Sequence, residues 1–318
     1  MKFWKLTAWV ALAALLLTGC GGPETPEAGE PSELPSQAIS FTDALGHDVT
    51  VEHWDTVVSL YGSFAETWML AGGELAGATS DAVEERQLDL ENAAIVGTVK
   101  EPNLEEIIAV QPDFVILAAD IAPQAKLHEA LTQAEIPHAY YRTDTFEEYL
   151  SMLEQFCSMT GRQDLYEQNG LAVQDQIESV LEAVDGQPSP TALLIRAYST
   201  GAKAKGEDNL AGIILRDLGV DNLVSRHESL LEELSMEEII AADPDWIFVT
   251  TMGSSDEAAM AYMSSTFEND PAWAGLSAVK NGQYVLLPRE LYHYKPNARW
   301  GESYAYLAEI LYPDVQLP

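Results

Sequence analysis

Two stretches of this chain repeat one another, and this duplication constrains the fold more than any other feature. Residues 103–120 read NLEEIIAVQPDFVILAAD, and residues 235–252 read SMEEIIAADPDWIFVTTM. The shared Glu-Glu-Ile-Ile-Ala begins at Glu105 in one copy and at Glu237 in the other, so the copies lie 132 residues apart (237 − 105). Short-repeat solenoids have periods of about 20–50 residues. The longer spacing therefore predicts two similar lobes with a cleft between them.

Each copy predicts a helix, a turn and a buried strand, in that order. In the first copy, Asn103 is a preferred N-cap residue, and the glutamates that follow suit the positive end of a helix dipole. Pro112 ends the helix because proline cannot continue it. The apolar run 114–117 is typical of a strand that is covered on both faces. The second copy has the same order of signals, so both lobes are expected to be α/β.

A helix is expected to connect the lobes. Apolar residues recur at helical spacing along residues 163–184, at Val173, Ile177, Val180, Leu181 and Val184. Gly170 weakens this pattern locally, and residues 186–190 end it. The pattern predicts an N-terminal lobe over residues 39–162, a linking helix over 163–187 and a C-terminal lobe over 188–318.

The N-terminus predicts export and lipid anchoring. Lys2 and Lys5 precede an apolar core, which has the length of a signal peptide and is short for a membrane span of about 20 residues. Leu17-Thr18-Gly19-Cys20 resembles a bacterial lipobox, in which the cysteine is lipidated. An ordinary signal peptide with a chance cysteine is the alternative. We expect a lipoprotein signal peptide at 1–19, lipidation at Cys20 and a flexible tether at 20–38.

The charge balance excludes one class of partner. The chain has 51 acidic and 16 basic residues, for a formal net charge of −35. Nucleic-acid binding needs a basic surface for the phosphates, so we expect no nucleic-acid partner. The same charge disfavours adhesion to anionic lipids, so membrane attachment is expected to depend on the lipid anchor.

Residue types that ligate metals are sparse. Cys157 is the only cysteine besides Cys20, so neither a disulfide nor a thiolate metal site is expected in the mature domain. Cys157 lies in a helical pattern and is expected to be a small buried hydrophobe. The six histidines show no metal-ligand spacing, which argues against a bare zinc or manganese site. We therefore expect no protein-held metal and no cofactor.

Several motifs follow one another along nearly the whole mature chain. They are the lipobox, FTDALGHDVTV at 41–51, VVSLYGSFAETWMLAGG at 57–73, both repeat copies, NLAGIILRDLGVDNLV at 209–224 and DPAWAGLSAVKNGQYVLLP at 270–288. In this order and spacing they resemble the substrate-binding lipoproteins of ABC importers for ferric siderophores, haem and cobalamin. The resemblance implies two Rossmann-like lobes with parallel-rich sheets, joined by one long helix, with the ligand cleft between them.

The resemblance also implies how the receptor docks on its permease. In that family the first acidic residue of each repeat helix, here Glu105 and Glu237, pairs with arginines on one half of the permease. The alternative is that these acids only stabilise the helix dipole, by about 0.3–1 kcal/mol, a role that Glu106 and Glu238 would share. An acid at the same position in both copies favours docking, because a permease with twofold pseudosymmetry needs one on each lobe.

The ligand site is expected in the cleft, at the carboxyl ends of the strands. Basic and aromatic side chains near these ends suit an anionic chelate or a flat ligand. The candidates are Tyr61, Ser63, Phe64 and Lys100, then Arg196, Tyr198, Lys203, Lys205 and Met252, and last the segment Tyr292–Lys295 with Arg299 and Trp300. Each has a surface or packing role as its alternative, and His293 either ligates haem iron or caps a loop.

The sequence therefore predicts a monomeric, membrane-anchored extracytoplasmic receptor that delivers a ferric-siderophore-type iron complex to an ABC permease. Haem or cobalamin is the alternative ligand within the same family. We do not expect an enzyme, since the sequence has no GxSxG, GxGxxG, P-loop or HExxH motif. A hydrolase-like or purely structural lipoprotein is the alternative from another class.

Overall fold

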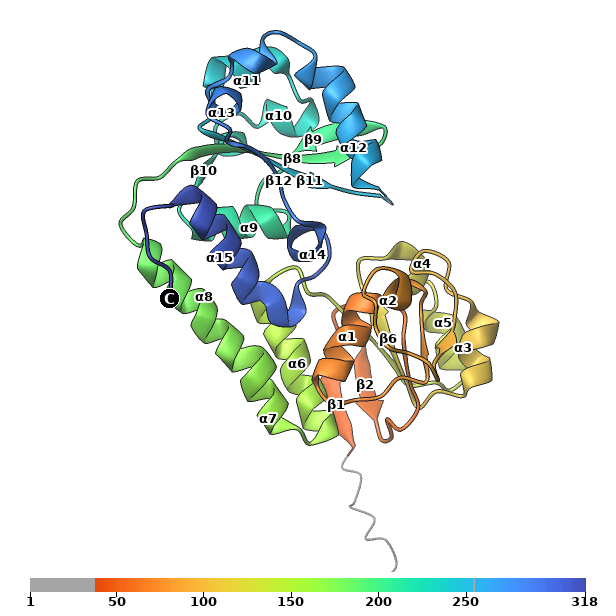
Figure 1. The fold of residues 1–318 in the computed structure, drawn as a ribbon. Coiled ribbons are helices and arrows are strands. Elements are labelled where there is room, and N and C mark those ends of the chain that lie inside the picture. The colour runs from red at the N-terminus through yellow and green to blue at the C-terminus, as the bar shows by residue number, and fades with distance from the viewer. Residues whose placement is uncertain (1–37, 254) are drawn as a thin grey trace, which may run out of the picture. The chain divides into compact units, whose positions relative to one another are not determined.

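Two mostly parallel sheets organise residues 38–253 and 255–318, the part of the chain that the structure, a computed structural model, describes (Figure 1). In the N-terminal half the strand order is β5-β4-β3-β6-β7, and all neighbours are parallel. The strands are β3 (Val57–Ser59), β4 (Gly77–Ala78), β5 (Ala94–Ile95), β6 (Phe114–Ala118) and β7 (His138–Tyr141). An antiparallel hairpin of β1 (Ile39–Thr42) and β2 (Asp48–Val51) precedes them.

The C-terminal half has a second sheet of the order β10-β8-β11-β12, with β9 paired to β8. Its strands are β8 (Thr191–Tyr198), β9 (Gly201–Ala204), β10 (Asp221–Asn222), β11 (Trp246–Thr251) and β12 (Tyr284–Leu286). The pairs along the main order are parallel, whereas β9 runs antiparallel to β8. Both halves are thus α/β with parallel-rich sheets, as the sequence predicts.

Helices connect the parallel strands, as crossover connections require. The N-terminal half contains α1 (Gly62–Leu70), α2 (Asp81–Glu84), α3 (Leu104–Val110), α4 (Ala122–Ala125), α5 (His128–Gln133) and α6 (Phe146–Thr160). The C-terminal half contains α9 (Leu210–Asp217), α10 (Ser229–Glu232), α11 (Met236–Ala242), α12 (Asp256–Met263), α13 (Ser277–Lys280), α14 (Arg289–Tyr292) and α15 (Trp300–Leu311). Among the described helices, none is long and apolar enough to cross a membrane.

The duplicated segments fold alike, as predicted. Each forms a seven-residue helix, α3 or α11, and then a central strand, β6 or β11. Asn103 caps α3 by accepting a hydrogen bond from the Glu105 backbone N–H at 3.0 Å, and Ser235 caps α11. Both helices end at a left-handed residue, Gln111 with φ 55° and Asp243 with φ 41°, which again lie at equivalent places in the repeat.

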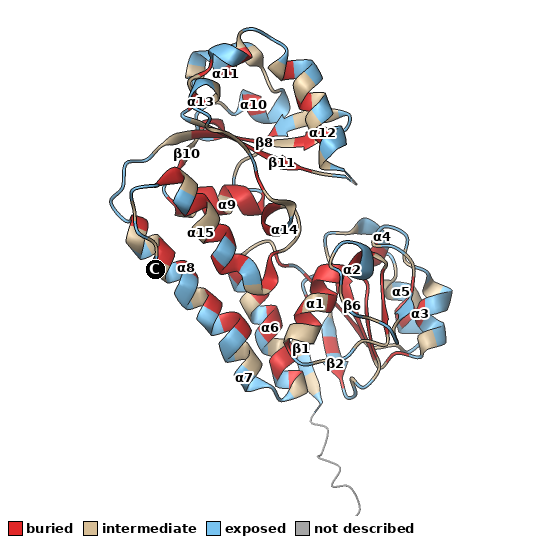
Figure 2. Cartoon of the chain, viewed as in Figure 1, coloured by how far each residue is buried: buried red, intermediate tan, exposed pale blue. Residues whose placement is uncertain are grey.

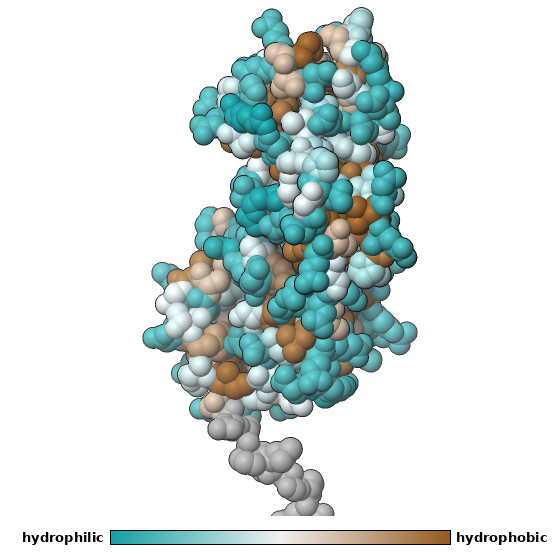
Figure 3. All heavy atoms as spheres, turned by 90° about the vertical axis from the view of Figure 1, so that its left-hand side faces the viewer, coloured by the Kyte–Doolittle hydropathy of each residue, from teal (hydrophilic) through white to brown (hydrophobic). Residues whose placement is uncertain are grey.

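The linking segment is helical, with a local change of winding. It consists of α7 (Gln163–Tyr166), a π-helical turn (Glu167–Leu171) and α8 (Ala172–Val184). Gly170 lies in this turn. A larger residue would not fit there, because its Cβ would come within 2.8 Å of a methyl group of Leu150. Figure 3 shows the molecule from the left-hand side of Figure 1. On this face hydrophilic side chains predominate, and hydrophobic ones are scattered between them.

One apolar cluster continues from the first sheet to the second. It contains Phe114 and Ile116 of β6 and Leu194 of β8, together with the inner faces of α1, α6, α8, α9 and α15. Figure 2 shows buried residues, in red, along each of these helices. Trp300 of α15 is fully buried and meets Phe146 of α6 edge-on, with ring centroids 6.0 Å apart. The halves are therefore joined by a shared core in addition to the linking helix.

Cys157 belongs to this cluster, as its helical pattern predicts. Its side chain is buried in α6 and forms no disulfide. Burial raises the pKa of its thiol to about 11, so hardly any thiolate exists at neutral pH.

Trp300→Ala tests the shared core. We expect the free energy of unfolding to fall by about 3–5 kcal/mol, because a large buried side chain leaves a cavity. Calorimetry of the wild type and of Trp300→Ala should show one unfolding transition for each protein, because one cluster joins the two halves. Leu45→Ala, which truncates an exposed side chain, should change the free energy of unfolding by no more than about 0.5 kcal/mol. Two separate transitions in the wild type would contradict a shared core.

Candidate functional site

Arg289, at the start of α14, lies beside the carboxyl end of β11. Its guanidinium donates to Asp256 Oδ1 at 2.8 Å and to the Gly253 carbonyl at 2.6 Å. Partial burial opposes its charge, but the hydrogen bonds and charges of Asp256 and Tyr294 together outweigh burial and raise the pKa of the guanidinium. These contacts fix a permanent cation at the carboxyl end of a strand, which is where ligands bind to open parallel sheets.

Arg86 supplies a second cation from the N-terminal half. It follows α2 and donates to Glu66 Oε2 of α1 at 2.7 Å. Its other terminal nitrogen donates to the backbone carbonyl of Lys295, which belongs to the C-terminal half. Arg86 therefore joins the two halves directly.

Tyr294 lies between these two cations. Its ring centroid is 5.6 Å from the guanidinium carbon of Arg86 and 5.4 Å from that of Arg289. Both distances are within the range of cation–π attraction. The ring thus holds charges from both halves close together without neutralising them.

His293 and Arg196 complete a group that we call the basic cluster: Arg86, Arg196, Arg289, His293 and Tyr294. Burial, together with the charges of Arg289 and Arg196, lowers the pKa of His293 to about 4. The imidazole is therefore neutral at pH 7. Arg196, in β8, has a buried Nε without a hydrogen-bond partner among the described residues. The cluster is cationic and has an unsatisfied donor.

Tyr61 borders the basic cluster from the N-terminal half. It follows β3, and its ring meets Phe64 edge-on at 5.0 Å. Burial raises the pKa of Tyr61 well above its ordinary value, and the charge of Arg86 opposes this shift. The phenol therefore stays protonated and is able to donate a hydrogen bond.

The structure brings together part of the predicted ligand set. Tyr61, Arg196 and His293 lie in or beside the basic cluster, and Met252 donates its backbone N–H to Ala197 of β8 at 2.9 Å. Tyr198 is the half-buried last residue of β8. The remaining cations are elsewhere occupied or on the surface: Lys100 and Lys203 are exposed, Lys205 pairs with Asp208, Arg299 pairs with Glu302 and Lys295 pairs with Asp144.

Four predicted ligand residues are buried and require a correction. Phe64, Tyr292 and Trp300 belong to the apolar cluster and have almost no accessible surface. Ser63 is also buried, and its hydroxyl donates to Asn297 Oδ1 at 3.1 Å. In this structure these side chains pack the halves together and offer no surface to a ligand.

Arg86 and Arg289 were not among the predicted residues. Arg289 follows β12 by three residues, so the rule that ligands meet strand ends would have identified it. Arg86 follows a four-residue helix, and no local pattern indicates that it reaches the other half. Only the folded chain brings Glu66 and Lys295 to it.

Three histidines that are distant in sequence gather in the N-terminal half. His47 and His128 stack with centroids 3.9 Å apart, and His128 Nδ1 lies 2.9 Å from His138 Nε2. His47 in turn contacts Asp43 at 3.1 Å. These ring nitrogens bind one another and Asp43, and no group among the described residues has the arrangement of a metal site. A histidine cluster therefore exists where the spacing indicated none, but the expectation of no bare metal site stands as a prediction.

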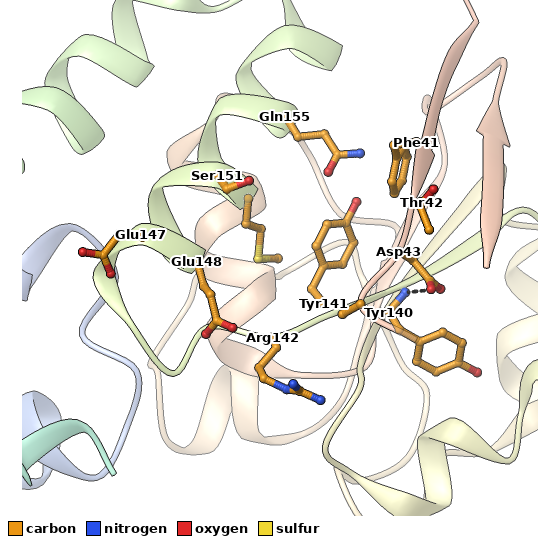
Figure 4. A pocket seen from close by; sticks show the side chains of 12 residues that line it. Phe41, Thr42, Asp43, Tyr140, Tyr141, Arg142, Glu147, Glu148, Ser151 and Gln155 are labelled. Carbon is orange, nitrogen blue, oxygen red and sulfur yellow. Dashed lines mark hydrogen bonds between the residues drawn. The ribbon is translucent and has the colours of Figure 1, made fainter. Parts of the chain in front are cut away.

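A hollow of about 450 Å³ lies elsewhere in the N-terminal half, between β1, β7 and α6 (Figure 4). Tyr141 and Gln155 point into it, and neither the Tyr141 hydroxyl nor the Gln155 amide nitrogen has a hydrogen-bond partner among the described residues. Its charged lining residues are Arg142 and the acids Asp43, Glu147 and Glu148. The acidic excess suits an anionic ligand poorly, so we place the candidate site at the basic cluster instead.

Known proteins resemble this chain over most of its length. The Fe(3+)-citrate-binding protein YfmC of Bacillus subtilis is 24% identical over 294 residues, which cover 91% of this chain and 90% of the relative. The putative ABC transporter substrate-binding lipoprotein YhfQ of the same species is 22% identical over 270 residues, covering 80% and 82%. The crystal structure of Staphylococcus aureus SirA complexed with staphyloferrin B has a TM-score of 0.66 and 23% identity, covering 87% of this chain and 99% of that one.

A family match agrees with these relatives. Residues 57–291, which include both sheets and the whole basic cluster apart from His293 and Tyr294, match the family described as periplasmic binding protein. The match spans well over half of the chain. This chain therefore belongs to the periplasmic binding protein family.

Proposed function

We propose that this protein is the extracytoplasmic receptor of an ABC importer and that it captures an anionic ferric chelate of the siderophore type. Delivery to the permease leaves the ligand chemically unchanged, so the protein is a binding protein and not an enzyme. The observation that carries the proposal is the basic cluster, in which the charges of Arg86, Arg196 and Arg289 act on a neutral histidine in a chain of net charge −35. The Fe(3+)-citrate-binding relative supports the same ligand class.

Arg196 is the cation with the most to gain from a ligand. Arg86 and Arg289 already bind Glu66 and Asp256, whereas Arg196 Nε is buried and has no hydrogen-bond partner within residues 38–253 and 255–318. A guanidinium donates a planar fork of hydrogen bonds that fits carboxylate or hydroxamate oxygens. The chelate brings its own iron coordination, so the protein supplies charge, aromatic contact and shape.

His293 supports haem as an alternative ligand. A neutral imidazole is the form that ligates iron, and the low pKa of His293 keeps it neutral. Cobalamin is the third ligand class to be tested. Absorption spectra of the protein with ferric citrate, haem and cobalamin separate the three ligands. Axial ligation by His293 would alter the haem spectrum, and that change would be lost in His293→Ala.

Arg196→Ala is expected to weaken binding of ferric citrate by about 1.5–3 kcal/mol, the range for a charge-assisted hydrogen bond. That loss corresponds to a rise in Kd of roughly ten- to a hundred-fold. A neutral ligand such as cobalamin should lose less, because it gains less from the charge. Tryptophan fluorescence quenching measures each Kd. Arg216→Ala removes the same charge from an exposed arginine that pairs with Glu207 and Asp217, and should leave the Kd unchanged. Equal affinities of wild type and Arg196→Ala for every ligand would remove Arg196 from the site.

Glu105 and Glu237 are proposed to dock the permease. Both are exposed in the first turn of a repeat helix. Replacing both with Ala should reduce cellular uptake at least about ten-fold, because buried interface charges carry much of the binding energy, and should leave ligand affinity within about two-fold. Glu167→Ala with Glu309→Ala is the charge-matched control at exposed positions. A loss of ligand affinity would instead place the two glutamates in the ligand site.

Membrane anchoring is proposed to depend on Cys20, which lies outside the described residues. The proposed signal peptide, residues 1–19, and the tether, residues 20–38, also fall there, except for the last tether residue. Cys20→Ala should move the protein from the membrane fraction to the soluble fraction and leave ligand affinity unchanged. If the variant still sediments with membranes after a salt wash, the anchor lies elsewhere.

A further inference from the structure

The two repeat helices present the same side chains outward. α3 carries Glu105, Glu106, Ile108 and Ala109, and α11 carries Glu237, Glu238, Ile240 and Ala241; all are exposed except Glu238, which is half-buried and accepts a hydrogen bond from Ser229. Within each set the isoleucine is exposed: Ile108 is 42% exposed and Ile240 is 41% exposed. The neighbouring isoleucines, Ile107 and Ile239, are fully buried and hold each helix on its sheet.

The strands that follow these helices have diverged, although they are buried. β6 reads FVILA, and the equivalent residues 246–250 read WIFVT, with no position in common. Core residues are normally the more restricted, since exposed positions tolerate most substitutions. Here the Glu-Glu-Ile-Ile-Ala segment has stayed the same, including the buried Ile107 and Ile239, while the strand that follows has changed. Packing on the sheet accounts for the buried isoleucines and not for the exposed ones, and a partner that contacts both faces would account for these.

We propose that Ile108 and Ile240 are twin apolar contacts for the permease, each beside the acids of its own helix. Glu105 and Ile108 share a helix face because they are three residues apart, and so do Glu237 and Ile240. A partner that fits both faces has two similar patches, each with an apolar hollow beside a basic side chain. This inference rests on the proposed function, and it extends docking beyond the two acidic residues.

Exposure alone does not carry the inference, because single exposed hydrophobic residues are ordinary. Leu45 and Leu286 are each 39% exposed and lie outside the repeat, so they serve as matched controls. The distinguishing observation is that nearly equal exposure of the same residue recurs at the two equivalent places.

Site-specific photocrosslinking in cells that produce the full chain tests this contact. A photoreactive amino acid replaces Ile108 or Ile240, and in separate chains Glu106, Leu45 or Leu286. We expect products with integral membrane proteins from positions 108 and 240, and mass spectrometry should identify them as one polypeptide or as two of similar sequence. Positions 45 and 286 should not give these products.

A second measurement uses variants that leave the probe position intact. Ile108→Ser with Ile240→Ser should reduce the membrane product from a probe at Glu106 by about ten-fold, as loss of a central interface residue does. Leu45→Ser with Leu286→Ser should not change it. Capture at Glu106 together with no capture at 108 and 240 would overturn this inference and leave docking intact. If none of positions 106, 108 and 240 gave a membrane product, both the apolar contact and the proposed docking on the permease would be overturned. Crosslinks from 108 and 240 to unrelated proteins would overturn the twin contact.

Discussion

The apolar cluster shared by the two sheets is the interaction on which the rest of the structure depends. Burying a large apolar side chain contributes about 1.5–3 kcal/mol. A single hydrogen bond between the halves, such as that of Ser63 to Asn297, contributes a net of only about 0.5–1.5 kcal/mol. The cluster therefore joins the halves, and the polar contacts select their geometry. Arg86 reaches Tyr294 and Lys295 of the other half only because this core is in place.

The basic cluster is notable against the charge of the chain. With 16 basic and 51 acidic residues, the protein gathers three guanidiniums around His293. Two of them are each balanced by a carboxylate, which limits the cost of holding like charges together, and in the described part of the chain Arg196 is left with an unused donor. Such an arrangement attracts an anion at the strand ends while the rest of the acidic surface repels it.

The repeat predicted the fold well, since helix caps, proline stops and apolar strands are local signals. The helical pattern around Cys157 lies in α6, and the α3–β6 and α11–β11 units are present as predicted. The two-residue strands β4, β5 and β10 were missed because they are too short for a periodic pattern. The site was harder to predict. Trp300 was interpreted as a ligand contact, although Trp300, Tyr304, Leu307 and Leu311 share the helical spacing of a buried face. The reach of Arg86 and the histidine stack depend on folding and leave no local signal.

The buried thiol of Cys157 has a practical consequence. The thiolate is the nucleophile that attacks thiol-reactive dyes, and burial suppresses both its formation and its accessibility. A soluble chain that begins after Cys20 would contain this cysteine alone. One engineered surface cysteine would then be labelled selectively without replacing the native one. The fold thus provides a ready scaffold for a fluorescent sensor of its own ligand, read out from a single dye.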